Sequence, residues 1–266
     1  MDLRPINRYV AQMAYLETQA VRAALARWQQ ARNELLDRLA RLGTSPSLSV
    51  ALQDVLTETS RQIATDLRVS LAGVMQQAEA TAAAQIDGPA PRLTEAPDLA
   101  SGVAAWQAAT QGQLLAETSR LRTSGAGEAA IVARLITGRD GRQSVYEQAR
   151  TALQLTIEQA IWGAGNGALT RLYRQAGPGY RRQAIAAIDH RTTQCCLNVH
   201  GQIVGMDEPF VLTGTPRFAD AVMAPPFHWR CRTALALYHP RMEAIGTSTE
   251  ALRAQARAAL RARSTT

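Results

Sequence analysis

The segment QAGPGYRRQAIAAIDH (Gln175–His190) marks the point where the chain changes from a helical to a mixed pattern. Its Gly177-Pro178-Gly179 combines the two residue types that most often end helices. Short β-prone pieces follow at Ala184–Ile188, Gln202–Val204 and Phe210–Leu212, separated by glycine and proline. We therefore expect an α+β protein that is predominantly α-helical, with its strands confined to the part after this boundary.

Before the boundary, the sequence has the apolar periodicity of long helices. Apolar residues recur at helical spacing in two stretches, which are separated by the helix-breaking Gly43-Thr44-Ser45-Pro46. Ser47 is a suitable N-cap for the second helix, which would run to about Ile86. Two helices of this length favour a hairpin or an extended arm.

The patterns predict five consecutive segments. These are a helical hairpin or arm (1–86), a proline-rich linker or loop (87–102), a helical segment (103–176), a small α+β region (177–245) and a basic C-terminal helix (246–266). Within the third segment, WGAGNG (162–167) lacks the Gly-Lys-Ser/Thr ending and the preceding strand of a phosphate-binding loop. We expect a weak point or kink in a helix there.

The composition excludes several classes of protein. No apolar run is long enough for a transmembrane helix, and the N-terminus lacks the apolar core of a signal peptide, so no membrane partner is expected. The three cysteines do not make a disulfide framework, which favours the reducing cytoplasm.

The charge of the chain favours a nucleic-acid partner. The net charge is +7, and all 29 basic residues are arginine, which a GC-rich genome would also explain. Arg253, Arg257 and Arg261 recur on one face of the predicted terminal helix and could contact the phosphates of double-stranded DNA. The alternative for these three residues is an ordinary solvent-exposed helix face.

Two cysteine- and histidine-containing clusters, HRTTQCCLNVHG (190–201) and PPFHWRCR (225–232), follow the boundary. Cys196, His228 and Cys231 are the best-placed metal ligands, because His228 and Cys231 form an H-x-x-C pair that can converge on a tetrahedral ion. In an extended segment Cys195 would point away from Cys196, and no fourth ligand is evident. We favour the alternative of reduced, buried cysteines. No cofactor is therefore expected, with a structural zinc as the competing interpretation.

The same clusters could also carry catalysis. A thiol nucleophile would need a neighbouring histidine, which His190, His200 or His228 could supply. The H-x-E of zinc deaminases is absent, and the interval containing Asn198 and His200 is too short for the usual unit of an HNH nuclease. We expect no enzymatic activity, and the alternative is a metal-dependent, nuclease-like enzyme.

The order of residues in the two clusters resembles the C-terminal signature of the Mu F-like head-morphogenesis proteins, the minor capsid proteins of tailed bacteriophages. In that family an Asp-x-Arg-Thr leads to a cysteine five residues before a glycine, and a Pro-x-His-Pro-x-Cys-Arg-Cys segment follows. The resemblance covers roughly Ala129 to Leu237. The matching residues are Asp189, Arg191, Thr192, Cys196, Gly201, Pro226, His228, Cys231 and Arg232.

The chain departs from the family pattern at four positions. Thr193 stands where the family often has a further cysteine, and Thr233 stands where Cys-Arg-Cys has its last one. Trp229 replaces the proline after the histidine. Upstream, Ala149-Arg150-Thr151 resembles the family's Ala-Arg-Thr-Glu, but Ala152 replaces its glutamate. Two metal ligands that the family could offer are thus missing, which weakens the case for zinc.

The resemblance implies a non-enzymatic minor head protein, assembled in the host cytoplasm and located in the virion, inside the capsid near the portal vertex. Its partners would be the phage portal protein, the major capsid or scaffold protein, and double-stranded DNA. It would take part in head assembly and in DNA packaging or delivery. We expect the signature residues to be structural, because an arginine beside an aspartate-bearing turn can tie loops together by charge-assisted hydrogen bonds.

Overall fold

The computed structural model describes residues 4–42, 47–86, 91–93, 100–138, 143–189, 191–241, 254, 258 and 261. The predicted linker at 87–102 and the predicted terminal helix at 246–266 therefore lie mostly outside the described residues. Among the arginines of that helix, Arg253 and Arg257 lie outside them, whereas Arg261 is helical and exposed.

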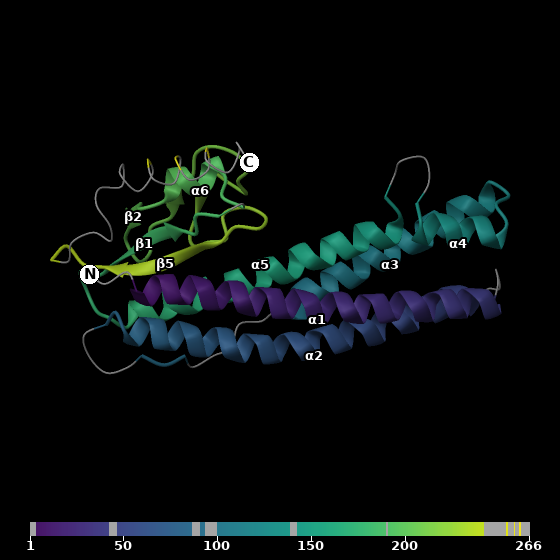
Figure 1. Cartoon of the computed structure of the whole chain (residues 1–266), viewed down its shortest axis with the longest axis horizontal. Coiled ribbons are helices and arrows are strands. Elements are labelled where there is room, and N and C mark those ends of the chain that lie inside the picture. The colour runs from purple at the N-terminus through teal and green to yellow at the C-terminus, as the bar shows by residue number, and fades with distance from the viewer. Residues whose placement is uncertain are drawn as a thin grey trace. The chain divides into compact units, whose positions relative to one another are not determined.

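The structure confirms a predominantly α-helical α+β protein with long N-terminal helices (Figure 1). The four long helices are α1 (Arg4–Leu42), α2 (Ser47–Ala83), α3 (Ala100–Thr123) and α5 (Val145–Arg174), and the shorter α4 (Glu128–Ile136) lies between α3 and α5 in the sequence. None of the described helices is both long enough and apolar enough to cross a membrane.

The chain folds into two compact units, each built from separate stretches of sequence. Unit 1 comprises Met1–Thr18, Ser70–Pro97 and Glu158–Thr266, and unit 2 comprises Gln19–Val69 and Asp98–Ile157. The boundaries fall inside α1, α2 and α5, so each unit combines parts of segments that are far apart in the sequence.

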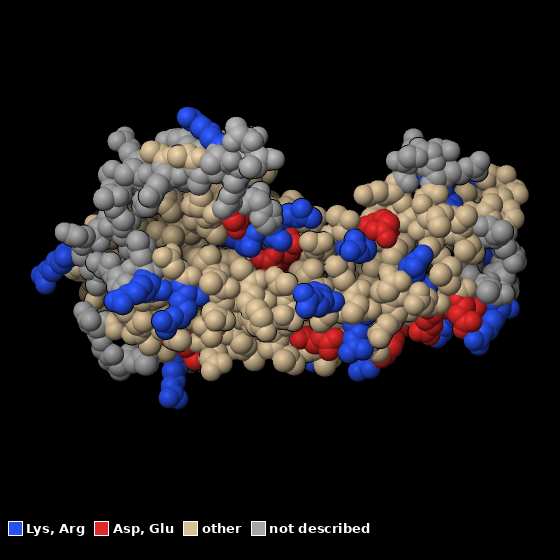
Figure 2. Space-filling model, viewed as in Figure 1, with Lys and Arg blue, Asp and Glu red and all other residues tan. Residues whose placement is uncertain are grey.

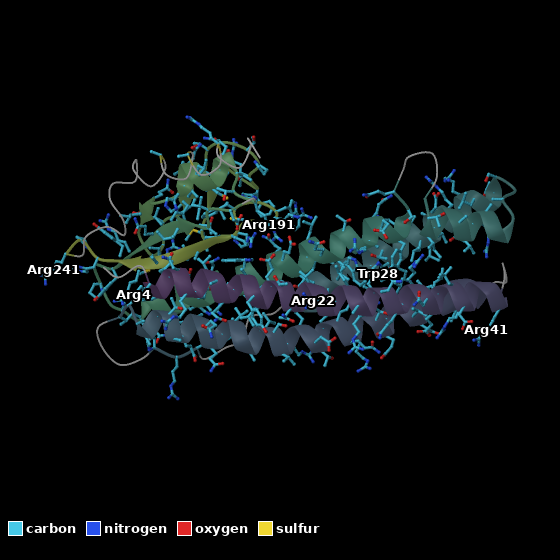
Figure 3. All side chains as sticks on the ribbon, viewed as in Figure 1. Arg4, Arg22, Trp28, Arg41, Arg191 and Arg241 are labelled. Carbon is cyan, nitrogen blue, oxygen red and sulfur yellow. The ribbon has the colours of Figure 1, made fainter. Side chains whose placement is uncertain are left out.

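Unit 2 is helical, and its core contains a cluster of three aromatic residues. The rings of Trp28 and Tyr146 stack with centroids 4.7 Å apart, and Trp106 meets Trp28 edge-on at 5.4 Å. Trp28 Nε1 donates to Tyr146 O, and Tyr146 Oη donates to Trp28 O. Apolar burial and satisfied polar atoms thus join α1, α3 and α5 within this unit (Figure 3).

Unit 1 contains the strands. A three-stranded antiparallel sheet has the order β2 (Ile203–Val204), β1 (Arg181–Ala186) and β5 (Thr233–Tyr238). β3 (Phe210–Val211) pairs with β4 (Ala221–Val222), and the short helix α6 (Gln194–Val199) packs against β1.

The C-terminal part of α5 anchors the sheet. The buried Asn166 side chain donates to Thr233 O at 2.9 Å and accepts from Leu235 N at 3.1 Å. Tyr173 Oη contacts Leu235 O at 3.1 Å and Gln85 at 3.0 Å. β5 is thereby fixed to both α5 and the end of α2.

WGAGNG lies within a helix, as expected, and α5 continues through these residues without interruption. A Cβ at Gly165 would overlap Tyr9 Oη and lie 2.6 Å from Met13 Cε, so this glycine lets α1 approach α5 closely. Asn166 follows it as the anchor for β5. The segment is a packing site within the helix.

Candidate metal centre

Two local structures bring the cysteine and histidine side chains of unit 1 together. Thr193 caps α6, its side chain accepting from the backbone N–H of Cys196. The second structure is the turn His228–Cys231, closed by a hydrogen bond of 3.2 Å from Cys231 N to His228 O. Arg230 in this turn has φ 64°, a left-handed conformation that residues other than glycine rarely adopt. The turn places His228 and Cys231 on the same side.

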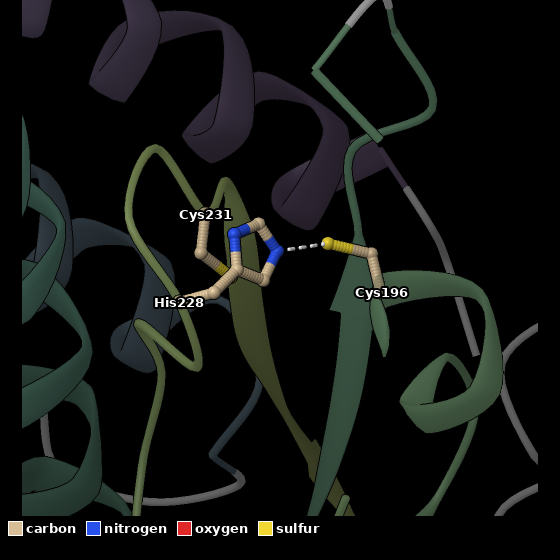
Figure 4. Close-up of side chains that lie close together, drawn as sticks. All are labelled: Cys196, His228 and Cys231. Carbon is tan, nitrogen blue, oxygen red and sulfur yellow. Dashed lines mark hydrogen bonds between the residues drawn. The ribbon is translucent and has the colours of Figure 1, made fainter. Parts of the chain in front are cut away.

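Cys196, His228 and Cys231 form one buried cluster (Figure 4). Their Sγ, Nε2 and Sγ atoms all lie within 4.8 Å of one another. Cys196 Sγ lies 2.8 Å from His228 Nε2, and all three cysteines of the chain are free thiols. The three residues that the sequence identified as candidate metal ligands are therefore assembled at one point.

The surroundings shift the pKa values of Cys196 and Cys231 in opposite directions. The interaction with Cys231 lowers the pKa of the Cys196 thiol to about 4 against the opposing effect of burial, and His228 adds to the decrease. Burial raises the pKa of Cys231 well above its usual value. Burial lowers the pKa of His228, but the contact with Cys196 and the hydrogen bond to Trp229 together outweigh burial and raise that pKa overall. Cys196 is the thiol prepared to act as a thiolate.

The other face of the His228 ring is held by the backbone. His228 Nδ1 lies 2.7 Å from the carbonyl oxygen of Trp229, so the ring donates its Nδ1–H there. Donation from Nδ1 to a carbonyl makes Nε2 the nitrogen that could bind a metal once its proton is lost, and metal-binding histidines are commonly fixed in this way.

The remaining sequence candidates take no part in the cluster. Cys195 and Cys196 lie on helix α6 and not in the extended segment that the sequence suggested. Cys195 is buried separately, and burial raises its pKa to about 11. His200 Nδ1 accepts a hydrogen bond from Ala186 N at 2.9 Å, so this histidine is bound to the end of β1. His190 lies outside the described residues.

Two threonines border the cluster. Thr193 Oγ1 lies 3.0 Å from His228 Nε2 and 3.5 Å from Cys196 Sγ. Cys231 Sγ donates to Thr233 Oγ1 at 3.3 Å. These are the two positions at which the sequence departs from a cysteine pattern, and the structure places Thr193 beside Cys196 and His228 and Thr233 beside Cys231.

The other signature residues hold the loops around the cluster. Arg232 Nη2 pairs with Asp189 Oδ2 at 2.9 Å, and Asp189 Oδ1 accepts from Arg191 N at 2.7 Å. Thr192 Oγ1 accepts from Asp189 N and donates to Ala187 O, both at 2.8 Å. Gly201 has φ 80°, which suits glycine at the end of α6.

A buried ion-pair cluster, which sequence reasoning missed, ties Arg191 to the helices of unit 1. Arg191 Nη1 forms a short ion pair with Glu17 of α1 and lies 3.5 Å from Glu158 Oε1 of α5. Both glutamates are almost fully buried, and Trp162 Nε1 donates to Glu17 Oε2 at 2.8 Å. The figures place Arg191 beside these helices (Figure 3). Nothing in the local sequence marks Glu17 or Glu158 as partners, because they are separated from Arg191 along the chain.

A second polar feature of unit 1 is a pocket of about 270 Å³ between the start of α1 and the end of α2. Arginine side chains gather over this end of α1, near Arg4 (Figure 2, Figure 3). Among the described residues that line the pocket, Arg4 and Arg8 are charged and none is a carboxylate, a composition that suits an anion. The lining residues are Arg4, Pro5, Arg8, Tyr9, Gln77, Ala80, Thr81 and Ala84.

Comparisons with protein-family models, with curated proteins and with solved structures found no match to this chain.

Proposed function

We propose that this chain is a non-enzymatic minor head protein of a tailed bacteriophage, which acts at the portal vertex in head assembly and in DNA packaging or delivery. The proposal starts from the resemblance of the C-terminal sequence to the Mu F-like signature. Its proposed partners are the portal protein, the major capsid or scaffold protein, and double-stranded DNA.

One structural observation carries the proposal: signature residues from the two sequence clusters contact one another. Asp189 pairs with Arg232 across the two clusters, and Cys196 meets His228 in the same way. If the two stretches resembled the family signature only by chance, there would be no reason for their matching residues to contact one another. Because these side chains contact one another, they hold the loops of the two clusters together, as expected of a structural protein.

The arginine-lined pocket supports the DNA part of the proposal. Arg4 and Arg8 lie one helical turn apart on α1, and both are exposed. Arg38 and Arg41, which lie on the same helix outside this pocket, form ion pairs with Glu34 and Asp37. Arg4 and Arg8 at the pocket are therefore the residues that we expect to contact the phosphates of DNA.

Virion localisation tests the main claim. The chain, carrying an affinity tag, is produced during assembly of the phage that encodes it, and the heads are reconstructed without imposed icosahedral symmetry. We expect density for this chain against the portal, and a tagged chain that copurifies with portal protein. Heads of normal composition that contain none of this chain would refute the proposal.

DNA binding is tested by salt dependence. We expect duplex binding to weaken steeply with salt, and the double variant Arg4→Gln/Arg8→Gln to reduce the slope of log K against log salt by about 1 to 2. The variant Arg38→Gln/Arg41→Gln removes the same charge and serves as the matched control. If both double variants reduce the slope equally, DNA binding depends only on net charge and not on Arg4 and Arg8. Binding that does not change with salt would remove DNA from the proposal.

The alternative function is a metal-dependent, nuclease-like enzyme. It is favoured by the three converging ligands, since catalytic zinc sites commonly have three protein ligands. A plasmid-nicking assay on protein with measured metal content separates the two functions. Nicking that is lost in His228→Ala while the helical circular-dichroism signal is retained would support the enzyme.

A further inference from the structure

We propose that Cys196, His228 and Cys231 bind one divalent ion of the zinc class, and that its fourth ligand is an oxygen supplied by the Thr193 hydroxyl or by a water held on it. This site would be a Cys₂His centre completed by oxygen. The inference rests on the geometry of the cluster and is independent of the proposed role in a phage head.

The separations of the ligand atoms fit a single small ion. Zinc–sulfur bonds of about 2.3 Å and zinc–nitrogen bonds of about 2.0 Å place tetrahedral ligand atoms roughly 3.5–3.8 Å apart. The three ligand atoms lie within 4.8 Å of one another, with Cys196 Sγ and His228 Nε2 at 2.8 Å. Side-chain shifts of about 1 Å would therefore convert the hydrogen-bonded cluster into a coordination shell.

The charge balance of the cluster also favours an ion. Two thiolates and one neutral imidazole around a divalent cation give a complex with no net charge. A neutral complex avoids most of the cost of burying isolated ions, and all three side chains are buried.

The protein already fixes the imidazole as a metal site requires. Nδ1 of His228 is engaged by the Trp229 carbonyl at 2.7 Å, which directs Nε2 to Cys196. The left-handed Arg230 lets His228 and Cys231 face the same point from one turn. Strained backbone of this kind is common where side chains must converge on a ligand.

Thr193 is the oxygen that best fits the fourth position. Its Oγ1 contacts two of the ligand atoms, at 3.0 Å from His228 Nε2 and 3.5 Å from Cys196 Sγ. Thr233 Oγ1 contacts only Cys231, from which it accepts a hydrogen bond. His200 is committed to Ala186 N. A hydroxyl or water is a weaker zinc ligand than a thiolate, so a cysteine at residue 193 should tighten binding.

Cobalt(II) substitution tests both parts of the inference. The full chain is purified under reducing conditions, stripped with a chelator and titrated with Co²⁺, followed by displacement with Zn²⁺. We expect one ion per chain, tetrahedral visible absorption and thiolate-to-cobalt charge-transfer absorption from two cysteines. Thr193→Cys should raise the charge-transfer intensity by about half and strengthen binding at least tenfold. Thr193→Val should weaken binding by roughly tenfold or more.

Cys195→Ala is the matched control, because this cysteine is adjacent in sequence and buried away from the cluster. It should leave the cobalt spectrum unchanged, whereas Cys196→Ser should lose one thiolate contribution. Circular dichroism of each variant verifies the fold. The inference is overturned if the folded chain binds no stoichiometric ion, or if Cys195→Ala and Cys196→Ser lose absorption equally. An unchanged spectrum in folded Thr193→Cys would overturn the assignment of the fourth ligand.

Discussion

Arg232 and Asp189 form an ion pair of 2.9 Å that connects the two loops of the cysteine–histidine cluster. The two side chains are only 14% and 24% exposed, so solvent screens the pair less than it screens a surface ion pair. A backbone hydrogen bond from Ala187 N to Arg232 O, at 2.9 Å, lies beside it. The loop that leads into α6 and the start of β5 are thus held together by charge as well as by backbone contacts.

Arg232→Met should therefore destabilise the protein. The substitution keeps an apolar stem of similar length but leaves the partly buried Asp189 carboxylate without its cation, at a cost of about 2 kcal/mol in the free energy of unfolding. Urea denaturation measures this cost. Arg217→Met is the control, because its partner Asp220 is 85% exposed and the change there should stay within about 0.5 kcal/mol. Comparable losses in both variants would contradict a special role for the Asp189 pair.

Gly165→Ala and Gly112→Ala should change stability in opposite directions. An added Cβ at Gly165 would overlap Tyr9 Oη and approach Met13 Cε to 2.6 Å, and overpacking of this kind costs about 1–3 kcal/mol. Gly112 lies within α3 with no atom within 4 Å of an added Cβ, so alanine there should stabilise the helix by about 0.5–1 kcal/mol. Thermal unfolding, monitored by circular dichroism, measures the change in stability of each variant. Stabilisation at both positions would mean that α1 and α5 are not in close contact at Gly165.

Asn166→Asp should weaken the attachment of β5 to α5. The side-chain amide donates to Thr233 O, and a carboxylate of the same shape would turn that hydrogen bond into a repulsion between two oxygens. We expect a loss of about 2–3 kcal/mol, with faster amide hydrogen exchange in β5. Thr170→Val, which removes a hydroxyl that bonds only within α5, is the comparison. Unchanged exchange in β5 of the Asp variant would disprove the anchoring role.

Glu117→Gln should destabilise the protein at neutral pH but not near pH 2. The hydrogen bond from Arg120, with help from Arg134 and against burial, lowers the pKa of Glu117 to about 2 from its usual 4.5. A depressed pKa contributes stability above pH 4.5, and this contribution disappears as the pH falls toward 2. Arg120 is largely exposed, so we expect a difference of about 1 kcal/mol above pH 5. Denaturation of both proteins between pH 2 and 7 measures it, and a pH-independent difference would contradict the mechanism.

The helices could be predicted from the sequence because their signals are local. Apolar periodicity located α1 and α2, and Ser47, expected to be an N-cap, is the first residue of α2. β5 could not be predicted from local signals, because Thr233–Tyr238 consists largely of alanine and leucine, which favour helix. Its strand conformation comes from pairing with β1 and from Asn166, contacts that no local pattern encodes.

The candidate site was predictable only in part. The H-x-x-C spacing indicated that His228 and Cys231 could converge, and the structure places the candidate Cys196 within 4.8 Å of both. The argument that excluded Cys195 was wrong about the backbone, since α6 is helical, although Cys195 does lie apart. The burial of Glu17 and Glu158 beneath Arg191 depends on the packing of three distant stretches, and spacing carries no information about it.

The division of the chain into two interleaved units constrains how it can be cut. Unit 1 needs residues from α1, α2 and the whole region after Glu158, whereas unit 2 takes up the two stretches between them. A fragment that begins after Thr18 loses Glu17, and one that stops before Arg181 loses Arg191, so either fragment lacks the ion pair between these two residues. Limited proteolysis or truncation at a single point therefore cannot release unit 1 intact. An expression fragment of unit 1 would need its three stretches rejoined by linkers in place of unit 2.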